Sequence, residues 1–199
     1  MAKSMTNVEV VRYALNHICG MTDAEFARSE GAWYEKTFQK GTMFNDYKNV
    51  CVELGFILQG TFRSYIIDSK TGDEKNIWLY SKNGFVVTFK SFLNQIPCEY
   101  YTSAITDAQV VCINITDLQK LYTASHRWEK FGRLMAETAF NVAMNRVEGF
   151  LIQSPEERYT EMLKAHPDVF DNVPLYHIAS YLGIQGPSLS RIRKRMANK

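Results

Sequence analysis

The chain has 199 residues, of which 46% are hydrophobic and 22% charged, with a formal net charge of +2. This composition is typical of a globular protein with one or two domains. No segment approaches the roughly 18 consecutive apolar residues of a membrane span, and polar residues interrupt the apolar positions of 1–20, so we expect neither a membrane helix nor a signal peptide. The four cysteines are widely scattered, which argues against zinc and iron–sulfur sites and indicates a reduced, cytoplasmic protein.

Residues 48–116 show the period-two alternation of β-strands. Apolar side chains alternate with others through residues 50–58, and Val111, Ile113 and Ile115 alternate in the last strand. Turn signals separate the runs, and many short strands of this kind predict a sandwich, roll or barrel. The expected strands cover residues 50–58, 61–68, 77–80, 100–106 and 111–115, with a further apolar run over 85–92.

A small β-roll could be a metal-dependent enzyme of the cupin type, but this chain lacks the side chains for that chemistry. Such sites need imidazole ligands grouped on strands, and all four histidines lie outside residues 48–116: His17, His126, His166 and His177. There is also no nucleophile elbow, phosphate-cradling glycine-rich loop or acid–base pair. We therefore expect neither a catalytic nor a metal site.

Residues 117–152 change to helical periodicity, with apolar residues on two sides of one long helix. One side must pack on the β-module, and the most economical partner for the other is the same helix of a second copy. The alternative is a helix buried within a monomer, since Thr138, Asn141 and Asn145 weaken the seam. The first stripe contains Phe131, Leu134, Met135, Thr138, Val142 and Asn145, and the second Phe140, Met144, Val147 and Leu151.

A further helix is expected directly after the long one. Ser154 can cap it, Pro155 suits its first position, and Glu157 completes a capping box. This helix should end at about Ala165, because Pro167 follows.

Residues 172–199 contain no acidic side chain and have the spacing of a helix-turn-helix. Gly183 suits the turn between the two helices because it adopts a left-handed conformation at little steric cost. The expected apolar positions are Leu175, Ile178, Ala179 and Leu182 on the first helix and Leu189, Ile192 and Met196 on the second.

The basic charge of the chain is concentrated on this second helix. Without Arg191, Arg193, Lys194, Arg195 and Lys199, 18 basic residues would stand against 21 acidic ones. A local cationic helix favours DNA binding over two alternatives, an ordinary helical hairpin with a solvated face and a basic end that contacts anionic membrane. The candidate DNA-binding residues are Gln185, Ser188, Ser190, Arg191, Arg193, Lys194 and Arg195.

This order of elements resembles the Crp/Fnr family of bacterial transcription regulators, and most closely its Bacteroidetes branch. The similar segments are LQGTFRSY (58–65), EERY (156–159), PLYHIASYLGI (174–184) and LSRIRK (189–194). The resemblance implies an α+β protein: an antiparallel, cyclic-nucleotide-binding-like β-roll (a double-stranded β-helix), a long dimerisation helix and a helix-turn-helix. It also implies a sensor domain over 1–122, a dimerisation helix over 123–153 and a DNA-binding domain over 154–199, acting as a cytoplasmic homodimer on double-stranded DNA.

The ligand-binding positions of the family are replaced in this chain. Members that bind cyclic AMP use Gly-Glu and Arg-Ser pairs, where a gap-free alignment places Val87-Thr88 and Cys98-Glu99. A carboxylate in place of the cation repels a phosphate. We therefore expect no cofactor and no tight binding of cyclic AMP, and an unidentified small effector instead. The aligned pocket positions are Phe85, Val87, Thr88, Cys98, Glu99, Ala143 and Met144.

The DNA-binding end also departs from the family. Gly186 and Pro187 lie where relatives place base-reading side chains, Arg191 keeps its expected position, and we expect no C-terminal wing. The sequence thus predicts few base contacts, reliance on phosphates and steep salt dependence. The alternative function is a ligand-binding sensor or interaction protein whose helix-turn-helix no longer recognises a specific sequence.

Overall fold

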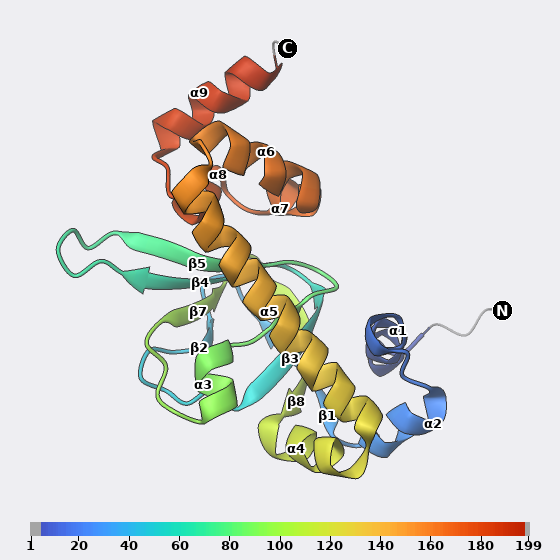
Figure 1. Cartoon of the computed structure of the whole chain (residues 1–199). Coiled ribbons are helices and arrows are strands. Elements are labelled where there is room, and N and C mark those ends of the chain that lie inside the picture. The colour runs from blue at the N-terminus through green and yellow to red at the C-terminus, as the bar shows by residue number, and fades with distance from the viewer. Residues whose placement is uncertain (1–4, 198–199) are drawn as a thin grey trace.

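Two four-stranded antiparallel sheets form the β-roll, as expected for the predicted α+β class. The computed structural model describes residues 5–197, apart from the side chains of Asp168 and Ala197. One sheet has the strand order β1-β8-β3-β6 and the other β2-β7-β4-β5 (Figure 1). The strands are β1 (Trp33–Phe38), β2 (Met43–Asn45), β3 (Glu53–Gln59), β4 (Phe62–Ile67), β5 (Glu74–Tyr80), β6 (Phe85–Val86), β7 (Tyr101–Ala104) and β8 (Ala108–Asn114).

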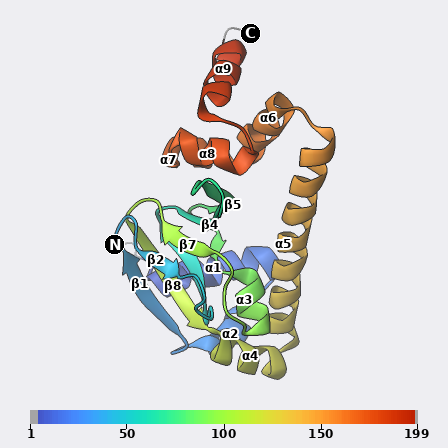
Figure 2. The same ribbon diagram turned by 90° about the vertical axis from the view of Figure 1, so that its left-hand side faces the viewer.

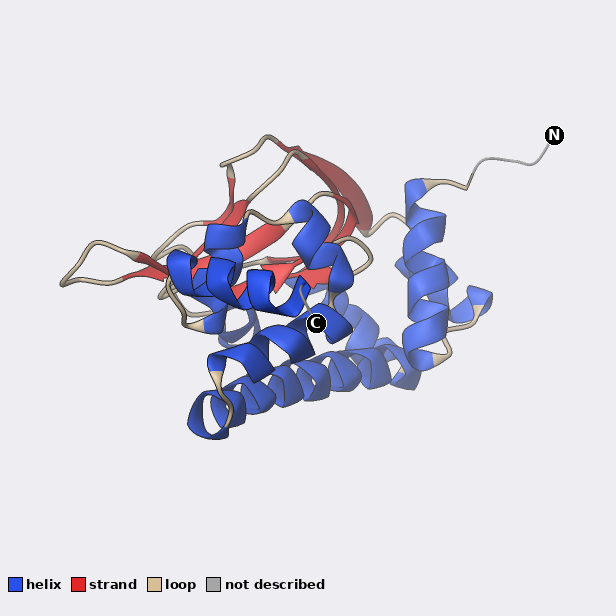
Figure 3. Cartoon of the chain, turned by 90° about the horizontal axis from the view of Figure 1, so that it is seen from above, coloured by secondary structure: helices blue, strands red, loops and turns tan. Residues whose placement is uncertain are grey.

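Helices precede and follow the roll, and a short one interrupts it. The longest, α5, runs along one flank of the strands and connects the roll to the C-terminal helices (Figures 2 and 3). None of the described helices is both long enough and apolar enough to span a bilayer. The helices are α1 (Asn7–Cys19), α2 (Asp23–Phe26), the 3₁₀ turn η1 (Ala27–Ser29), α3 (Phe89–Asn94), α4 (Ile115–Ala124), α5 (His126–Ile152), α6 (Pro155–Ala165), α7 (Pro167–Asn172), α8 (Leu175–Leu182) and α9 (Gly186–Ala197).

The structure corrects several predicted boundaries. The β-module begins at Trp33 and not at Lys48, because β1, of which only Trp33 is buried, pairs with β8 along its length. The apolar run over 85–92 is the two-residue strand β6 followed by α3. The helical region is interrupted at Ser125, whose extended backbone separates α4 from α5. A short helix, α7, follows α6 where no helix was predicted.

The first half of α5 is built into the core of the roll. Trp128 and Phe131 are fully buried, and Trp128 donates a hydrogen bond from Nε1 to the carbonyl of Glu25 at 3.1 Å. The Trp128 ring also lies 6.3 Å from Phe26 and 6.4 Å from Trp33, between ring centroids. Aromatic contacts therefore fix the start of α5 against both α2 and β1.

The second half of α5 leaves an apolar stripe uncovered. Phe140, Val147 and Leu151 are 65%, 51% and 78% exposed, and Met144 lies between them. The opposite stripe differs from the prediction, since Thr138 and Asn145 are exposed. The side chain of Arg146 instead turns toward the roll and contacts β5.

All four cysteines are buried as free thiols: Cys19, Cys51, Cys98 and Cys112. Burial raises the pKa of each thiol, that of Cys112 to about 12. At neutral pH these side chains are therefore protonated, and they pack as small apolar groups.

The turn between β3 and β4 requires glycine at position 60. Gly60 has φ +91°, and a Cβ there would lie 2.5 Å from the Asp107 carbonyl oxygen and 2.6 Å from the Ala108 Cβ. We predict that Gly60→Ala lowers the free energy of unfolding by about 3 kcal/mol, because it adds a clash to an unfavourable backbone conformation. Gly41 is the matched control, with φ +87° and nothing within 4 Å of its Cβ position. Gly41→Ala should cost only about 1 kcal/mol in a urea titration, and equal losses at the two sites would contradict the steric argument.

Candidate nucleic-acid interface

Helices α8 and α9 form the predicted helix-turn-helix, with five of its seven predicted apolar positions buried and the other two, Leu175 and Met196, half-buried. Gly183 ends α8 in the left-handed conformation (φ 68°), and its N–H bonds back to the carbonyls of Ala179 and Ser180. Ala179 is buried where the two helices meet, which lets them approach closely. The buried residues that pack α8 and α9 together include Ile178, Ala179, Leu182, Leu189 and Ile192.

The predicted capping box of α6 is confirmed, and the residue after it, Arg158, joins α6 to its neighbours. The Ser154 hydroxyl accepts from the N–H of Glu157 at 3.3 Å, and the Glu157 carboxylate accepts from the N–H of Ser154 at 2.7 Å. Arg158 then donates to the carbonyls of Gln153 and Leu182, at 2.7 and 3.1 Å. The end of α5, the start of α6 and the end of α8 are thus joined by one side chain.

The polar face of α9 is open to solvent. Arg191, Arg193 and Lys194 are exposed, and Arg191 donates to the Ser188 hydroxyl at 3.3 Å. Arg195 is exposed too but lies 2.8 Å from the carboxylate of Glu156. Lys199, part of the predicted basic charge, lies outside the described residues.

A groove separates the start of α6 from α9 and collects part of the predicted set. It has a volume of about 640 Å³, and Ser188, Arg191, Lys194 and Arg195 line it together with Ser154 and Glu156. By helical periodicity Ser190 and Arg193 face the other side of α9, and the Ser190 hydroxyl donates to the Gly186 carbonyl at 3.2 Å. Gln185 precedes α9 and lines a separate cleft of about 580 Å³ against the β4–β5 hairpin.

Helix α8 docks on the free edge of β5, which is the outermost strand of its sheet. The N–H of Asn76 donates to the Ser180 hydroxyl at 2.9 Å, and that hydroxyl donates to the Glu74 carbonyl at 3.0 Å. The Asn76 amide also donates to the His177 carbonyl at 2.9 Å. The Ser180 side chain of α8 thereby satisfies two backbone groups that an edge strand leaves unpaired.

Arg146 of α5 completes this contact. A bulge leaves Ile77 without a partner on β4, and Arg146 donates to the carbonyls of Ile77, Asn76 and Tyr181. Its guanidinium lies 4.3 Å from the centre of the Tyr181 ring. Burial lowers the pKa of Arg146, and its buried Nε has no hydrogen-bond partner among the described residues.

A second polar contact joins β4 to α8. Arg63 pairs with Glu74 at 2.5 Å and donates to Nδ1 of His177 at 3.2 Å. Burial and the adjacent Arg63 guanidinium lower the pKa of His177 to about 4. The imidazole is therefore neutral at physiological pH, which lets it accept the hydrogen bond from Arg63.

The predicted ligand-pocket residues occupy three separate environments. Val87, Thr88 and Cys98 are buried inside the roll, and Phe85 packs between Phe56 and Phe131. Glu99 is exposed and pairs with Lys90 at 2.6 Å. Ala143 and Met144 lie on the exposed side of α5.

The interior of the roll near Thr88 is occupied by a chain of hydroxyl groups. The Thr88 hydroxyl lies 3.2 Å from that of Thr102, which lies 2.7 Å from that of Ser64. Ser64 contacts the Tyr80 hydroxyl at 3.1 Å, and Tyr80 donates to the Val87 carbonyl at 2.9 Å. These hydroxyl groups and the Val87 carbonyl are thus hydrogen-bonded to one another. Among the described residues, no group of three or more His, Cys, Asp or Glu side chains could hold a metal ion.

Sequence reasoning missed the residues that dock the helix-turn-helix on the roll. The sequence did contain one indication of this contact. Arg146 follows Val142 by four residues, so it places a charge on the side of α5 that carries the first predicted stripe. Its partners are backbone carbonyls at a bulge, which no side-chain pattern reveals. Asn76 and Ser180 are polar residues of ordinary spacing and gave no signal.

The docking contact predicts a specific pH dependence. Because the pKa of His177 is lowered from 6.5 to about 4 on folding, its contribution is present above pH 6.5 and is lost as the pH falls, when only the unfolded state takes up the proton. We predict a decrease in the free energy of unfolding of about 2 kcal/mol between pH 6.5 and 4.5. Urea titrations should show that His177→Gln removes this slope, whereas His126→Gln, at an exposed site, keeps it. An unchanged slope in His177→Gln would refute the assignment.

Neither a protein-family model nor a curated protein sequence matches the chain, but solved structures do. FixK2 from Bradyrhizobium japonicum is 17% identical with a TM-score of 0.69, covering 83% of this chain and 85% of that one. A protein from Eubacterium rectale assigned to the Crp/Fnr family of transcriptional regulators is 18% identical with a TM-score of 0.65, covering 89% and 84%. The Thermus thermophilus Catabolite Activator Protein is 14% identical with a TM-score of 0.56, covering 93% and 87%.

Identities this low establish a shared fold and not a shared ligand. The resemblance predicted from the sequence is thus confirmed at the level of the fold: the chain has the β-roll, long helix and helix-turn-helix architecture of the Crp/Fnr regulators.

Proposed function

We propose that the protein is a cytoplasmic, homodimeric transcription regulator of the Crp/Fnr type that binds double-stranded DNA through α9. The observation that carries this proposal is the exposed cationic face of α9, which is held in place by packing against α8. Arg191 reads a guanine, whose O6 and N7 a guanidinium can bond together. Ser188, Arg193, Lys194 and Arg195 hold phosphates, and Gln185 and Ser190 lie at the margins of this surface. The groove between α6 and α9 provides room for the DNA backbone beside Arg191 and Lys194.

The uncovered stripe of α5 supports the homodimer. Phe140, Met144, Val147 and Leu151 form an apolar strip that a second copy of α5 would remove from water. Two-fold symmetry would then present two α9 helices to successive major grooves, about 34 Å apart. In this proposal residues 1–122 form the sensor, 123–153 the dimerisation helix and 154–199 the DNA-binding domain.

The roll supports an effector other than cyclic AMP. Glu99 presents a carboxylate where a cyclic phosphate would need a cation, and its partner Lys90 is exposed beside it. Val87, Thr88 and Cys98 are the buried candidates for contact with the effector, and Phe85, which packs against Phe131, would connect them to α5. Ala143 and Met144 belong to α5 itself and lie on its exposed side. An effector there would act by changing the position of α5 and hence the spacing of the two α9 helices.

One observation favours a second function, that of a sensor or interaction protein without sequence-specific DNA binding. Gly186 and Pro187 open α9 and provide no side-chain donor or acceptor for a base edge. Sequence selectivity would then depend mainly on Arg191.

The dimer interface can be tested with one added charge. Val147→Asp places a carboxylate within the apolar stripe, where burying it against a second copy would cost several kcal/mol. We expect a monomer by sedimentation equilibrium and at least a tenfold loss of DNA affinity. Asn145→Asp adds the same charge to an exposed position of α5 outside the stripe and should remain dimeric. A dimeric Val147→Asp variant would exclude this interface.

DNA recognition can be tested with a duplex that the wild-type protein selects from a random pool. Arg191→Ala should lower the preference for this duplex over a scrambled one by about 10- to 100-fold, the contribution of a bidentate base contact. Arg193→Ala should weaken binding to both duplexes equally, because a phosphate contact carries no sequence information. Fluorescence anisotropy at fixed salt measures both ratios.

The selection itself distinguishes the two candidate functions. A sequence-specific regulator enriches a duplex, and if a dimer neutralises roughly six phosphates, its affinity for that duplex should fall by about three decades between 50 and 200 mM salt. A pool from which the wild-type protein enriches no duplex would favour the sensor without sequence-specific binding.

A further inference from the structure

A cationic cavity lies where α5 begins. This end of α5 is the one far from α9 (Figure 1). It has a volume of about 470 Å³ and is lined by residues of α2, η1 and the junction of α4 with α5. A cavity of this size can hold a small metabolite. No part of the proposed DNA-binding surface contributes to it.

The cavity carries excess positive charge. Arg28, Arg127 and Lys130 line it, and the carboxylate among its lining residues belongs to Glu25. Hydrogen bonds from the N–H and hydroxyl of Thr22, and the pairing with Arg127, lower the pKa of Glu25 to about 2, so this carboxylate is ionised. Three cations against one carboxylate leave an excess of two positive charges at neutral pH.

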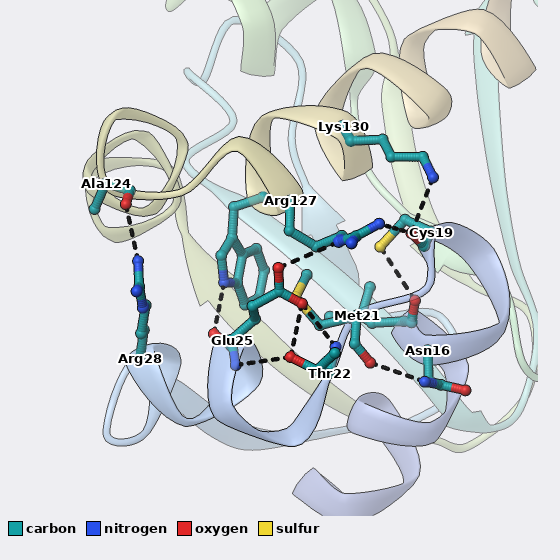
Figure 4. A network of polar contacts seen from close by, with 11 residues as sticks. Asn16, Cys19, Met21, Thr22, Glu25, Arg28, Ala124, Arg127 and Lys130 are labelled. Carbon is teal, nitrogen blue, oxygen red and sulfur yellow. Dashed lines mark hydrogen bonds and ion pairs between the residues drawn. The ribbon is translucent and has the colours of Figure 1, made fainter.

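These cations retain donors for a ligand (Figure 4). Arg28 uses Nη1 for the Ala124 carbonyl at 3.0 Å, which leaves Nε and Nη2. Arg127 uses Nε for Glu25 and Nη1 for the Cys19 carbonyl, at 3.3 and 3.1 Å, which leaves Nη2. Lys130 donates one of its three N–H groups to the same Cys19 carbonyl at 3.2 Å. Apart from Glu25, the partners shown for these cations are neutral carbonyls.

Ser125 supplies an independent indication of a ligand. It is 9% exposed and lines the cavity, yet among the described residues its hydroxyl makes no hydrogen bond. Ser125 is the N-cap residue of the 27-residue helix α5 and does not cap it with its side chain. The hydroxyl and the free N–H groups of the first turn are therefore both available to an anion, which the helix dipole also attracts.

We propose that this cavity binds the phosphate group of a small molecule, either inorganic phosphate or a phosphate monoester. The dianionic group balances the excess charge, and its three or four oxygens accept from Arg28, Arg127 and the Ser125 hydroxyl. Lys130 adds a further cation at the α1 side. Binding here would tie α2 and η1 to the start of the dimerisation helix.

The test is isothermal titration of the full chain with inorganic phosphate and, separately, with glycerol phosphate, at constant ionic strength set by sodium chloride. Saturable binding of either anion by the wild-type protein is expected. Arg28→Gln should weaken it about tenfold through loss of a charge-assisted hydrogen bond, and Ser125→Ala should weaken it several-fold. Lys120→Gln removes an exposed cation of α4 that pairs with Asp117 and should bind like the wild type. Tighter binding of glycerol phosphate would identify a phosphorylated metabolite as the ligand, and equal binding would identify inorganic phosphate.

Two outcomes would overturn the proposal. One is the absence of saturable binding of both anions by the wild-type protein. The other is binding that persists in the Arg28→Gln, Ser125→Ala double variant but is lost in Arg191→Gln, which would place the phosphate on α9. Thermal melts of each variant, followed by circular dichroism, establish that the comparison is between folded proteins.

Discussion

The relation between the two halves of the molecule depends on how the free edge of β5 is satisfied. Its unpaired backbone groups at Asn76 and Ile77 are bonded by Ser180 of α8 and by Arg146 of α5. Arg146 is half-buried, its hydrogen-bond partners are carbonyls, and its buried Nε is unpaired among the described residues, so part of the cost of desolvating its charge is uncompensated. The free energy of docking the helix-turn-helix on the roll is therefore a small difference between the hydrogen bonds that Arg146 makes and the cost of desolvating its charge. Small changes at β5 should consequently have a large effect on docking.

A single helix, α5, connects the core of the roll, the edge of β5 and the C-terminal helices. Its 27 residues span about 40 Å at 1.5 Å per residue. Trp128 fixes its start in the core, and Arg146 fixes its second half to β5. On the other side, the stripe of Phe140, Met144, Val147 and Leu151 remains uncovered. Because both anchors lie on one uninterrupted helix, together they fix its orientation on the roll.

The sequence predicted best those features that are specified by residues close together in the chain. The capping box at Ser154 and the turn at Gly183 are set within a few positions, and both are confirmed. Strand β1 was missed because it has little buried surface and is defined by pairing with β8, some 75 residues away. The contacts of Arg146 depend on a bulge in another element, and the separation of Glu99 from Thr88 depends on side-chain direction, so neither follows from spacing.

The burial of all four thiols affects how readily the protein reacts with oxidants. A thiolate is the species that reacts with peroxide, and burial keeps Cys19, Cys51, Cys98 and Cys112 in the protonated form. The folded chain should thus be indifferent to the redox state of its surroundings. A single new cysteine placed on an exposed helix would be the preferred point of attachment for a thiol-reactive spectroscopic label, so motions of α5 and α9 could be followed without removing any native residue.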